Sequence, residues 1–266
     1  MNAILTVLGC RGSMAVSNAS TQKYGGSTSA FRLQVKEKNI FFDAGTGILK
    51  ADLFDGEAHL LLSHMHIDHI LGIPFWTPLF SKHNCIHIYG EARCGMSIQE
   101  QLCQFLCRPY LPVGIELFLG VKGYHTLIAG ESFSLGDGIT VHTLRSNHPD
   151  ICTAFRVNWE EHSVVYALDF EHSSDAAKAL SDFAYGCDVL IFDATYTPEE
   201  YENKIGWGHA TWAEGMKIKE AAKIKTLLLS HHDLNHTDTF LDNLQEKLTK
   251  QDKQVFLAQE GMEFLI

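Results

Sequence analysis

The feature that most constrains this chain is the histidine-rich segment at residues 63–69 (SHMHIDH), which directly follows the apolar run at residues 60–62 (LLL). It places three imidazoles and one carboxylate within six positions. Imidazole and carboxylate together suit zinc, iron or manganese. The spacing H-x-H-x-D-H differs from the H-E-x-x-H of a helical zinc protease. Two histidines two positions apart can point at one metal from the end of a strand, while the adjacent Asp-His pair turns toward a second. The segment therefore predicts a two-metal hydrolytic site rather than a structural zinc site or a polar surface turn.

Composition is consistent with an enzyme that acts on a small substrate. The 266 residues, 45% of them hydrophobic, suffice for one large domain or two small ones. The formal net charge of −11 argues against a broad electrostatic surface for nucleic acid. A small anionic substrate remains compatible with that charge, because bound divalent metals would invert the local field.

Membrane and secretion signals are not expected. The sequence has no apolar run of 18 residues, so it predicts no transmembrane helix. Residues 1–9 (MNAILTVLG) lack a basic segment, which argues against a signal peptide. The seven cysteines form an odd count without C-x-x-C, and this favours a reduced, cytoplasmic protein. No membrane partner is expected.

The remaining pattern alternates strands with helices. Apolar runs predict strands at 3–8, 30–35, 39–42, 58–62, 124–129, 139–144, 152–158, 162–168, 188–192, 225–230 and 254–258. Helical spacing predicts helices at 95–107, 175–184, 210–222 and 237–249. We find no low-complexity linker, so a single domain over residues 1–266, built from two similar halves, is the expected organisation.

Further candidate ligands follow three of the later strands. His148 comes after the strand at 139–144, Asp169 ends an apolar strand, and the last predicted ligand strand runs into His231 and His232. One sheet edge would bring all these strand ends together. We prefer His231 over His232 as the last ligand, because LSH at residues 229–231 repeats LSH at residues 62–64.

The order H-x-H-x-D-H, then His, then Asp, then His resembles the metallo-β-lactamase superfamily. That resemblance implies an α/β fold, a four-layer αββα sandwich, with two divalent metal ions at one edge. Zinc is the preferred metal, with manganese or iron as alternatives. Asp43 matches the early Asp-x-Gly turn of the family, which supports the cluster. By this resemblance His64, His66 and His148 would bind one metal, Asp68, His69 and His231 would bind the other, and Asp169 would bridge them.

A further loop points to one branch of the superfamily. Residues 207–211 (WGHAT) resemble the His-Ser-Thr loop of the phosphodiesterase branch, which includes tRNA 3′-processing endonucleases. Residues 192–195 (FDAT) resemble its His-Glu-Ala-Thr loop, with Asp in place of Glu. Glyoxalase II-type thioesterases lack the added histidine, His209 here. Common class B β-lactamases have cysteine where Asp169 stands, and flavodiiron proteins have glutamate at the position of His66. The alternative is that His209 is a helix-terminal histidine without a chemical role.

The resemblance and the residue chemistry predict a phosphoric diester hydrolase. Asp68 would orient a metal-bridging hydroxide and accept its proton, and His209 would assist the departing oxygen. Short motifs around Gly12, Gly25, Gly72, His209 and His232 resemble a bacterial subfamily of cyclic-nucleotide or cyclic-phosphate phosphodiesterases. A homodimer is an expectation from the resemblance alone.

The substrate prediction keeps several alternatives. A cyclic nucleotide or cyclic phosphate is preferred, because the chain is acidic and carries no Gly- and Lys-rich insertion that could grip tRNA. The alternatives are a tRNA- or RNA-processing nuclease of the tRNase Z type and a metal-bound nucleotide sensor with little turnover. A third enzyme candidate is the phosphonate-pathway type that opens a ribosyl cyclic phosphate, although this sequence shows no Cys/His structural zinc site. Substrate-binding residues are not assigned. The apolar loops at 72–80 and 108–113 would either line a base pocket or pack into the core.

Overall fold

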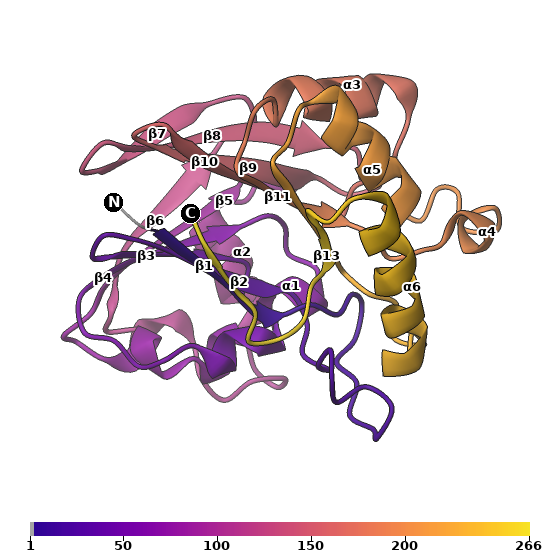
Figure 1. Ribbon diagram of the computed structural model, residues 1–266. Coiled ribbons are helices and arrows are strands. Elements are labelled where there is room, and N and C mark those ends of the chain that lie inside the picture. The colour runs from indigo at the N-terminus through magenta and orange to yellow at the C-terminus, as the bar shows by residue number, and fades with distance from the viewer. Residues whose placement is uncertain (1–2) are drawn as a thin grey trace.

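The computed structural model describes residues 3–266, which form two facing β-sheets with helices outside them (Figure 1). The strand order is β14-β1-β2-β3-β4-β5-β6 in the first sheet and β13-β12-β11-β10-β9-β8-β7 in the second. The first sheet comprises β1 (Ala3–Gly9), β2 (Ala30–Val35), β3 (Lys38–Phe42), β4 (Glu57–Leu62), β5 (Cys85–Glu91), β6 (Val121–Leu127) and β14 (Glu263–Leu265). The second comprises β7 (Ser132–Gly136), β8 (Ile139–Ser146), β9 (Cys152–Trp159), β10 (His162–Ala167), β11 (Val189–Asp193), β12 (Thr226–Ser230) and β13 (Val255–Leu257).

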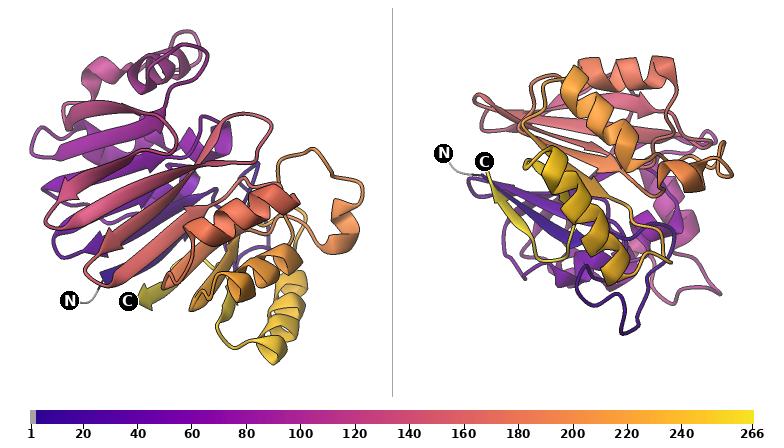
Figure 2. Two further views of the ribbon diagram at one scale, coloured as in Figure 1. Left: turned by 90° about the horizontal axis from the view of Figure 1, so that it is seen from above. Right: turned by 45° about the vertical axis from the view of Figure 1, so that its right-hand side comes forward.

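The helices are α1 (Ile67–Ile70), α2 (Ile98–Phe105), α3 (Ser174–Phe183), α4 (Pro198–Tyr201), α5 (Trp212–Ala221) and α6 (Asp238–Gln251), with short 3₁₀ turns at 46–50, 73–75, 77–80 and 115–117. Helices α2, α3, α5 and α6 pack against the sheets. The longer helices begin where hydroxyl side chains cap them: Ser97 forms a capping box on α2, and Thr211 and Thr237 accept a backbone N–H at the start of α5 and α6. Helices α3 and α5 lie side by side on the second sheet, and α6 runs beside β13 (Figures 1 and 2).

Three apolar layers hold the sandwich together. The layer between the sheets contains Phe42 and Tyr166, whose rings stack at 5.1 Å. A second layer joins α3, α5 and α6 to the second sheet, and a third joins α2 and the 3₁₀ turns to the first sheet. Burial of this apolar area is the main favourable term in folding. The predicted αββα sandwich is confirmed.

The structure differs from the sequence prediction at several elements. Strands β5, β7 and β14 were not predicted. Strand β5 contains Gly90, which breaks its apolar alternation; a Cβ there would lie 2.6 Å from Ile98, so the glycine lets α2 approach the sheet. Strand β6 lies at 121–127 rather than 124–129. The helix predicted at 95–107 spans only 98–105, because Arg93 and Met96 close a turn just before its cap.

Most of the apolar loop at 72–80 packs into the core. Trp76 is 2% exposed and packs edge-on against Phe41 at 4.9 Å, whereas Phe75 in the same loop is 58% exposed. In contrast, Tyr110 in the loop at 108–113 is 82% exposed. Across residues 3–266, no helix combines the length and the apolar character that spanning a membrane requires.

The topology explains where chemistry can occur. Strands β3 to β6 run parallel in the first sheet, and β10 to β13 run parallel in the second. Parallel strands end at the same edge of a sheet, so the loops that follow them gather at that edge. The histidine-rich segment follows β4, and Asp169 and His231 follow β10 and β12.

Candidate metal centre

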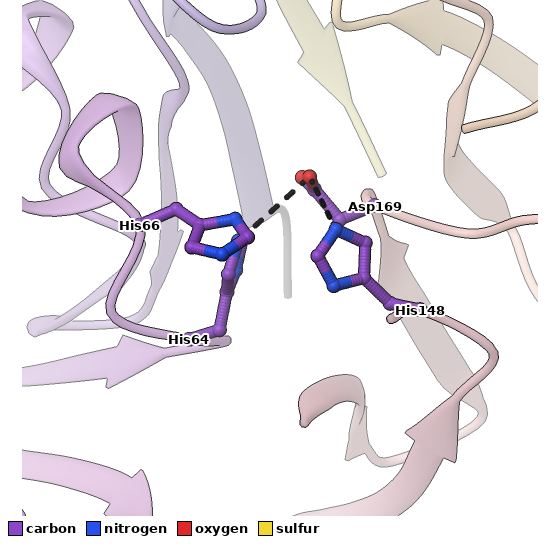
Figure 3. A group of neighbouring side chains, drawn as sticks. All are labelled: His64, His66, His148 and Asp169. Carbon is purple, nitrogen blue, oxygen red and sulfur yellow. Dashed lines mark ion pairs between the residues drawn. The ribbon is translucent and has the colours of Figure 1, made fainter. Parts of the chain in front are cut away.

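The structure brings all seven predicted ligands to one edge of the sandwich. The histidine-rich segment and α1 supply four of them from the first sheet; the other three follow β8, β10 and β12 of the second. In Figure 3, His64 and His66 approach from one side and His148 and Asp169 from the other. Possible metal-holding atoms of these side chains and two neighbours form three groups, each within 4.8 Å: His64, His66, His148 and Asp169; Asp68, His69 and His231; and Asp169, Asp193, His209 and His231. The first two groups contain the seven predicted ligands.

Asp169 lies between these two groups, with one carboxylate oxygen toward each. Its Oδ1 is 3.7 Å from His64 Nε2 and 3.5 Å from His148 Nε2. Its Oδ2 is 2.9 Å from His69 Nε2 and 3.3 Å from His231 Nε2. This is the arrangement that a bridging carboxylate needs.

The donor set fits two divalent ions. A tetrahedral ion with ligand bonds of about 2.1 Å holds its ligand atoms about 3.4 Å apart. Asp68 Oδ2 lies 3.3 Å from both His69 Nε2 and His231 Nε2, and these two nitrogens are themselves 3.3 Å apart. His64 Nε2 and Asp169 Oδ2 are buried and hydrogen-bond to no residue within the described part of the chain, 3–266. Buried polar atoms are rarely left unpaired in native proteins, so these atoms are suited to binding cations.

The second nitrogen of four histidines is held by a hydrogen bond, which fixes the ring and its tautomer. Each Nδ1–H donates to a nearby oxygen: His64 to Ser63 Oγ at 3.0 Å, His69 to Asp43 Oδ2 at 2.6 Å, His148 to the Asp150 carbonyl at 3.2 Å, and His231 to Thr195 Oγ1 at 3.0 Å. In the neutral tautomer that these contacts favour, each Nε2 carries a lone pair that can bind a cation.

Two buried aspartates support these hydrogen bonds from opposite sheets. Asp43 accepts from the Ser63 hydroxyl at 2.7 Å and from Tyr166 Oη at 2.6 Å. Asp193 accepts from the Thr195 hydroxyl at 2.9 Å. Burial and the Asp43 carboxylate raise the pKa of Tyr166 well above its usual value, so the phenol remains a donor. The sequence pointed to Asp43 but not to Tyr166, since a tyrosine inside a strand carries no distinguishing local signal.

His209 borders the centre and is held by Asp193. Its Nδ1–H donates to Asp193 Oδ2 at 2.9 Å, and its ring lies 4.9 Å from the His231 ring. Burial lowers the pKa of His209, but the Asp193 carboxylate outweighs that effect and raises it to about 9. In the metal-free protein the imidazole is therefore protonated at neutral pH, and its Nε2 is the nitrogen that can face a substrate.

The turn at Gly12 and Ser13 packs directly against the centre. The Ser13 N–H donates to Asp68 Oδ2 at 2.7 Å, which fixes that carboxylate. A Cβ on Gly12 would lie 2.3 Å from His231 Nδ1, so a side chain at residue 12 would displace the histidine. Both residues belong to a motif that the sequence resemblance included without giving it a role.

The structure brings His231 to the cluster and keeps His232 apart. His232 Nε2–H donates to the Ala258 carbonyl at 2.8 Å. Burial lowers the pKa of His232 to about 3, so its ring stays neutral in the core. The role of His231 as a ligand remains a prediction.

Alanine substitution separates the two histidines. His231→Ala should bind one metal ion fewer than the wild type, because it removes one of the three side chains of the second group. His232→Ala should keep the full number, since its ring only bonds Ala258. Metal content per folded chain measures both, with circular dichroism as the check on folding. Loss of metal from His232→Ala alone would reverse the assignment.

Comparison with known proteins agrees with this geometry. A family model described as "Beta-lactamase superfamily domain" matches residues 38–232. The chain belongs to the beta-lactamase superfamily. A relative from Bacillus subtilis (strain 168), "Probable metallo-hydrolase YhfI", is 24% identical, and the alignment covers 95% of this chain and 93% of the relative. A "Ribonuclease Z" from Picrophilus torridus is 25% identical over 92% of each chain.

Solved structures share the fold. The "New Diphosphatase from the PhnP Family" superposes with a TM-score of 0.74 at 20% identity, covering 100% of this chain and 98% of the other. These findings confirm the superfamily recognised from the ligand pattern and the enzyme class, a metal-dependent hydrolase.

Proposed function

We propose that this protein is a dinuclear metal-dependent phosphodiesterase that hydrolyses a small phosphodiester, a cyclic nucleotide or cyclic phosphate. The observation that carries the proposal is His209, which Asp193 holds beside the seven candidate ligands. Activating a water molecule does not require a protonated imidazole in addition to the ligand histidines. Hydrolysis of a phosphodiester benefits from one, because the departing alkoxide must receive a proton.

The ligands would be those that the family pattern indicates: His64, His66 and His148 for one ion, Asp68, His69 and His231 for the other, with Asp169 shared. Zinc suits this His- and Asp-rich set best, and manganese or iron are accepted by the same donors. Two such ions supply Lewis acidity and lower the pKa of bound water from about 15.7 to about 7.

Two side chains of the protein would handle the protons. Asp68 is held by the Ser13 N–H, so its carboxylate can orient the attacking water and take its proton. His209 Nε2 would give a proton to the departing oxygen, while its Nδ1–H remains on Asp193. The imidazolium would also stabilise the negative charge that develops there.

A second candidate function is RNA processing. It is favoured by the ribonuclease Z from Picrophilus torridus, which aligns over 92% of both chains. The net charge of −11 favours the smaller substrate, since RNA binding depends on neutralising many phosphates.

Hydrolysis by the full-length, metal-loaded protein tests the proposal. We expect metal-dependent cleavage of bis(p-nitrophenyl) phosphate, abolished by EDTA and restored by zinc or manganese. In a panel of cyclic nucleotides and precursor tRNA, the cyclic nucleotides should be the better substrates. Cleavage of tRNA alone would favour the nuclease. No cleavage with both metals bound would favour a nucleotide sensor.

A further inference from the structure

A pocket of about 290 Å³ lies beside the candidate metal centre, between the histidine-rich segment and α2. We call it the α2 pocket. Met65 and Ile67 line it from one side, Met96 and Phe105 from the other, and Arg93 and Gln101 also contribute to its wall. Its walls are thus largely apolar, with thioether and aromatic groups that pack well against flat rings.

The lining of the α2 pocket lies next to candidate ligands in the chain. Met65 and Ile67 flank the candidate ligand His66. Asp150, which also lines the pocket, has Oδ2 3.9 Å from His66 Nε2, and its backbone carbonyl accepts from His148 Nδ1 at 3.2 Å. A substrate whose phosphorus sits at the centre would therefore place a substituent in this pocket.

Two buried polar atoms of the pocket lining have no hydrogen-bond partner within residues 3–266. Arg93 is 6% exposed; it donates through Nη2 to the Ser63 carbonyl at 3.0 Å, whereas Nη1 makes no hydrogen bond and forms only a long ion pair, 3.7 Å from Asp150 Oδ1. Gln101 is 5% exposed; its Nε2 donates to two backbone carbonyls, which identifies the unpaired atom as the amide oxygen. The pocket lining therefore holds one donor and one acceptor that make no hydrogen bond within residues 3–266.

We propose that the α2 pocket binds the nucleobase of the substrate, an inference that rests on the proposed phosphodiesterase function. A nucleobase is a flat ring that presents neighbouring acceptor and donor atoms on one edge, as adenine does with N7 and N6. Arg93 Nη1 would donate to the acceptor and Gln101 Oε1 would accept from the donor. Both atoms are buried, so side chains of the pocket lining would have to move for a base to reach them.

Binding of product-like ligands tests this proposal without relying on turnover. The probes are adenosine 5′-monophosphate and ribose 5-phosphate, which differ by the base, titrated calorimetrically into the metal-loaded full chain. The wild type should bind adenosine 5′-monophosphate at least about tenfold more tightly, because only that ligand fills the pocket.

A matched pair of variants on α2 locates the preference. Gln104 is exposed and lines the pocket, so Gln104→Trp should fill the space and reduce the ratio of the two affinities toward one. Gln99 is exposed on the same helix outside the pocket lining, so Gln99→Trp should leave the ratio unchanged. Circular dichroism verifies that both variants fold.

The outcomes separate this proposal from the proposed function. Equal affinities in the wild type, or a ratio that Gln104→Trp does not change, would overturn the nucleobase pocket even if the protein hydrolyses phosphodiesters. A preference that Gln104→Trp abolishes would support the pocket even if no phosphodiester is hydrolysed, and only the proposed function would then fail.

Discussion

Asp169→Ala is expected to lose both metal ions and all measurable phosphodiester hydrolysis. The carboxylate is 1% exposed and turns one oxygen toward each half of the ligand set. Removing a group that only orients a ligand typically costs about 10–100-fold in metal affinity. Removing a side chain that both sites share should therefore lower the affinity for each ion by more than about 100-fold. Equilibrium dialysis against zinc, with the content of both ions counted, measures the effect.

A surface aspartate provides the control for this variant. Asp175→Ala removes a carboxylate from the exposed side of α3 and should retain both ions. If Asp169→Ala still binds two ions with near-wild-type affinity, then Asp169 does not bridge them and the proposed ligand assignment is wrong.

His209→Ala should keep both metal ions but lose about 10²–10⁴-fold in kcat for a cyclic nucleotide, the usual cost of removing a positioned proton donor. The imidazole is held by Asp193 rather than by the ligand histidines, so its removal should leave metal content unchanged. Steady-state kinetics and metal analysis of the same preparation measure both properties, and His83→Ala on an exposed loop is the control.

The leaving group distinguishes proton donation from a purely structural role. The p-nitrophenolate ion departs without needing a proton, whereas the alkoxide of a cyclic nucleotide requires one. The loss in His209→Ala should accordingly be much smaller with bis(p-nitrophenyl) phosphate. An equal loss with both substrates would show that His209 supports the site in another way.

The clustering of the candidate ligands could be predicted because their positions obey a simple topological rule. His64, His148, Asp169 and His231 each follow an apolar strand, and the ends of parallel strands meet at one edge. The local sequence also separated His231 from His232, since the context around His64 recurs at residue 231. The structure places these side chains together, and metal content remains to be measured.

Other parts of the site depend on contacts between distant segments and left no local pattern. Tyr166 reaches Asp43 across 123 positions of the chain, and the Ser13 N–H reaches Asp68 across 55. The α2 pocket combines Arg93, Gln101 and the histidine-rich segment, which only the packed structure brings together. The apolar loop at 72–80 was a plausible pocket wall by composition, yet Trp76 fills the core instead.

Strand prediction failed for the same reason at β5. Its residues 85–91 include His87 and Gly90, which interrupt the apolar pattern expected of a buried strand. The strand forms because β4 and β6 flank it on both sides and supply its backbone hydrogen bonds. Such tertiary demands override local preference in sheets.

Under the proposed ligand assignment, each ion would bind side chains from both sheets and so hold the two halves together. The Asp43–Tyr166 hydrogen bond also joins the halves, just behind the centre. Metal that binds only the docked arrangement stabilises it by mass action. Chelation should therefore lower the stability of the whole sandwich. Conversely, metal affinity should fall when the two sheets are misaligned.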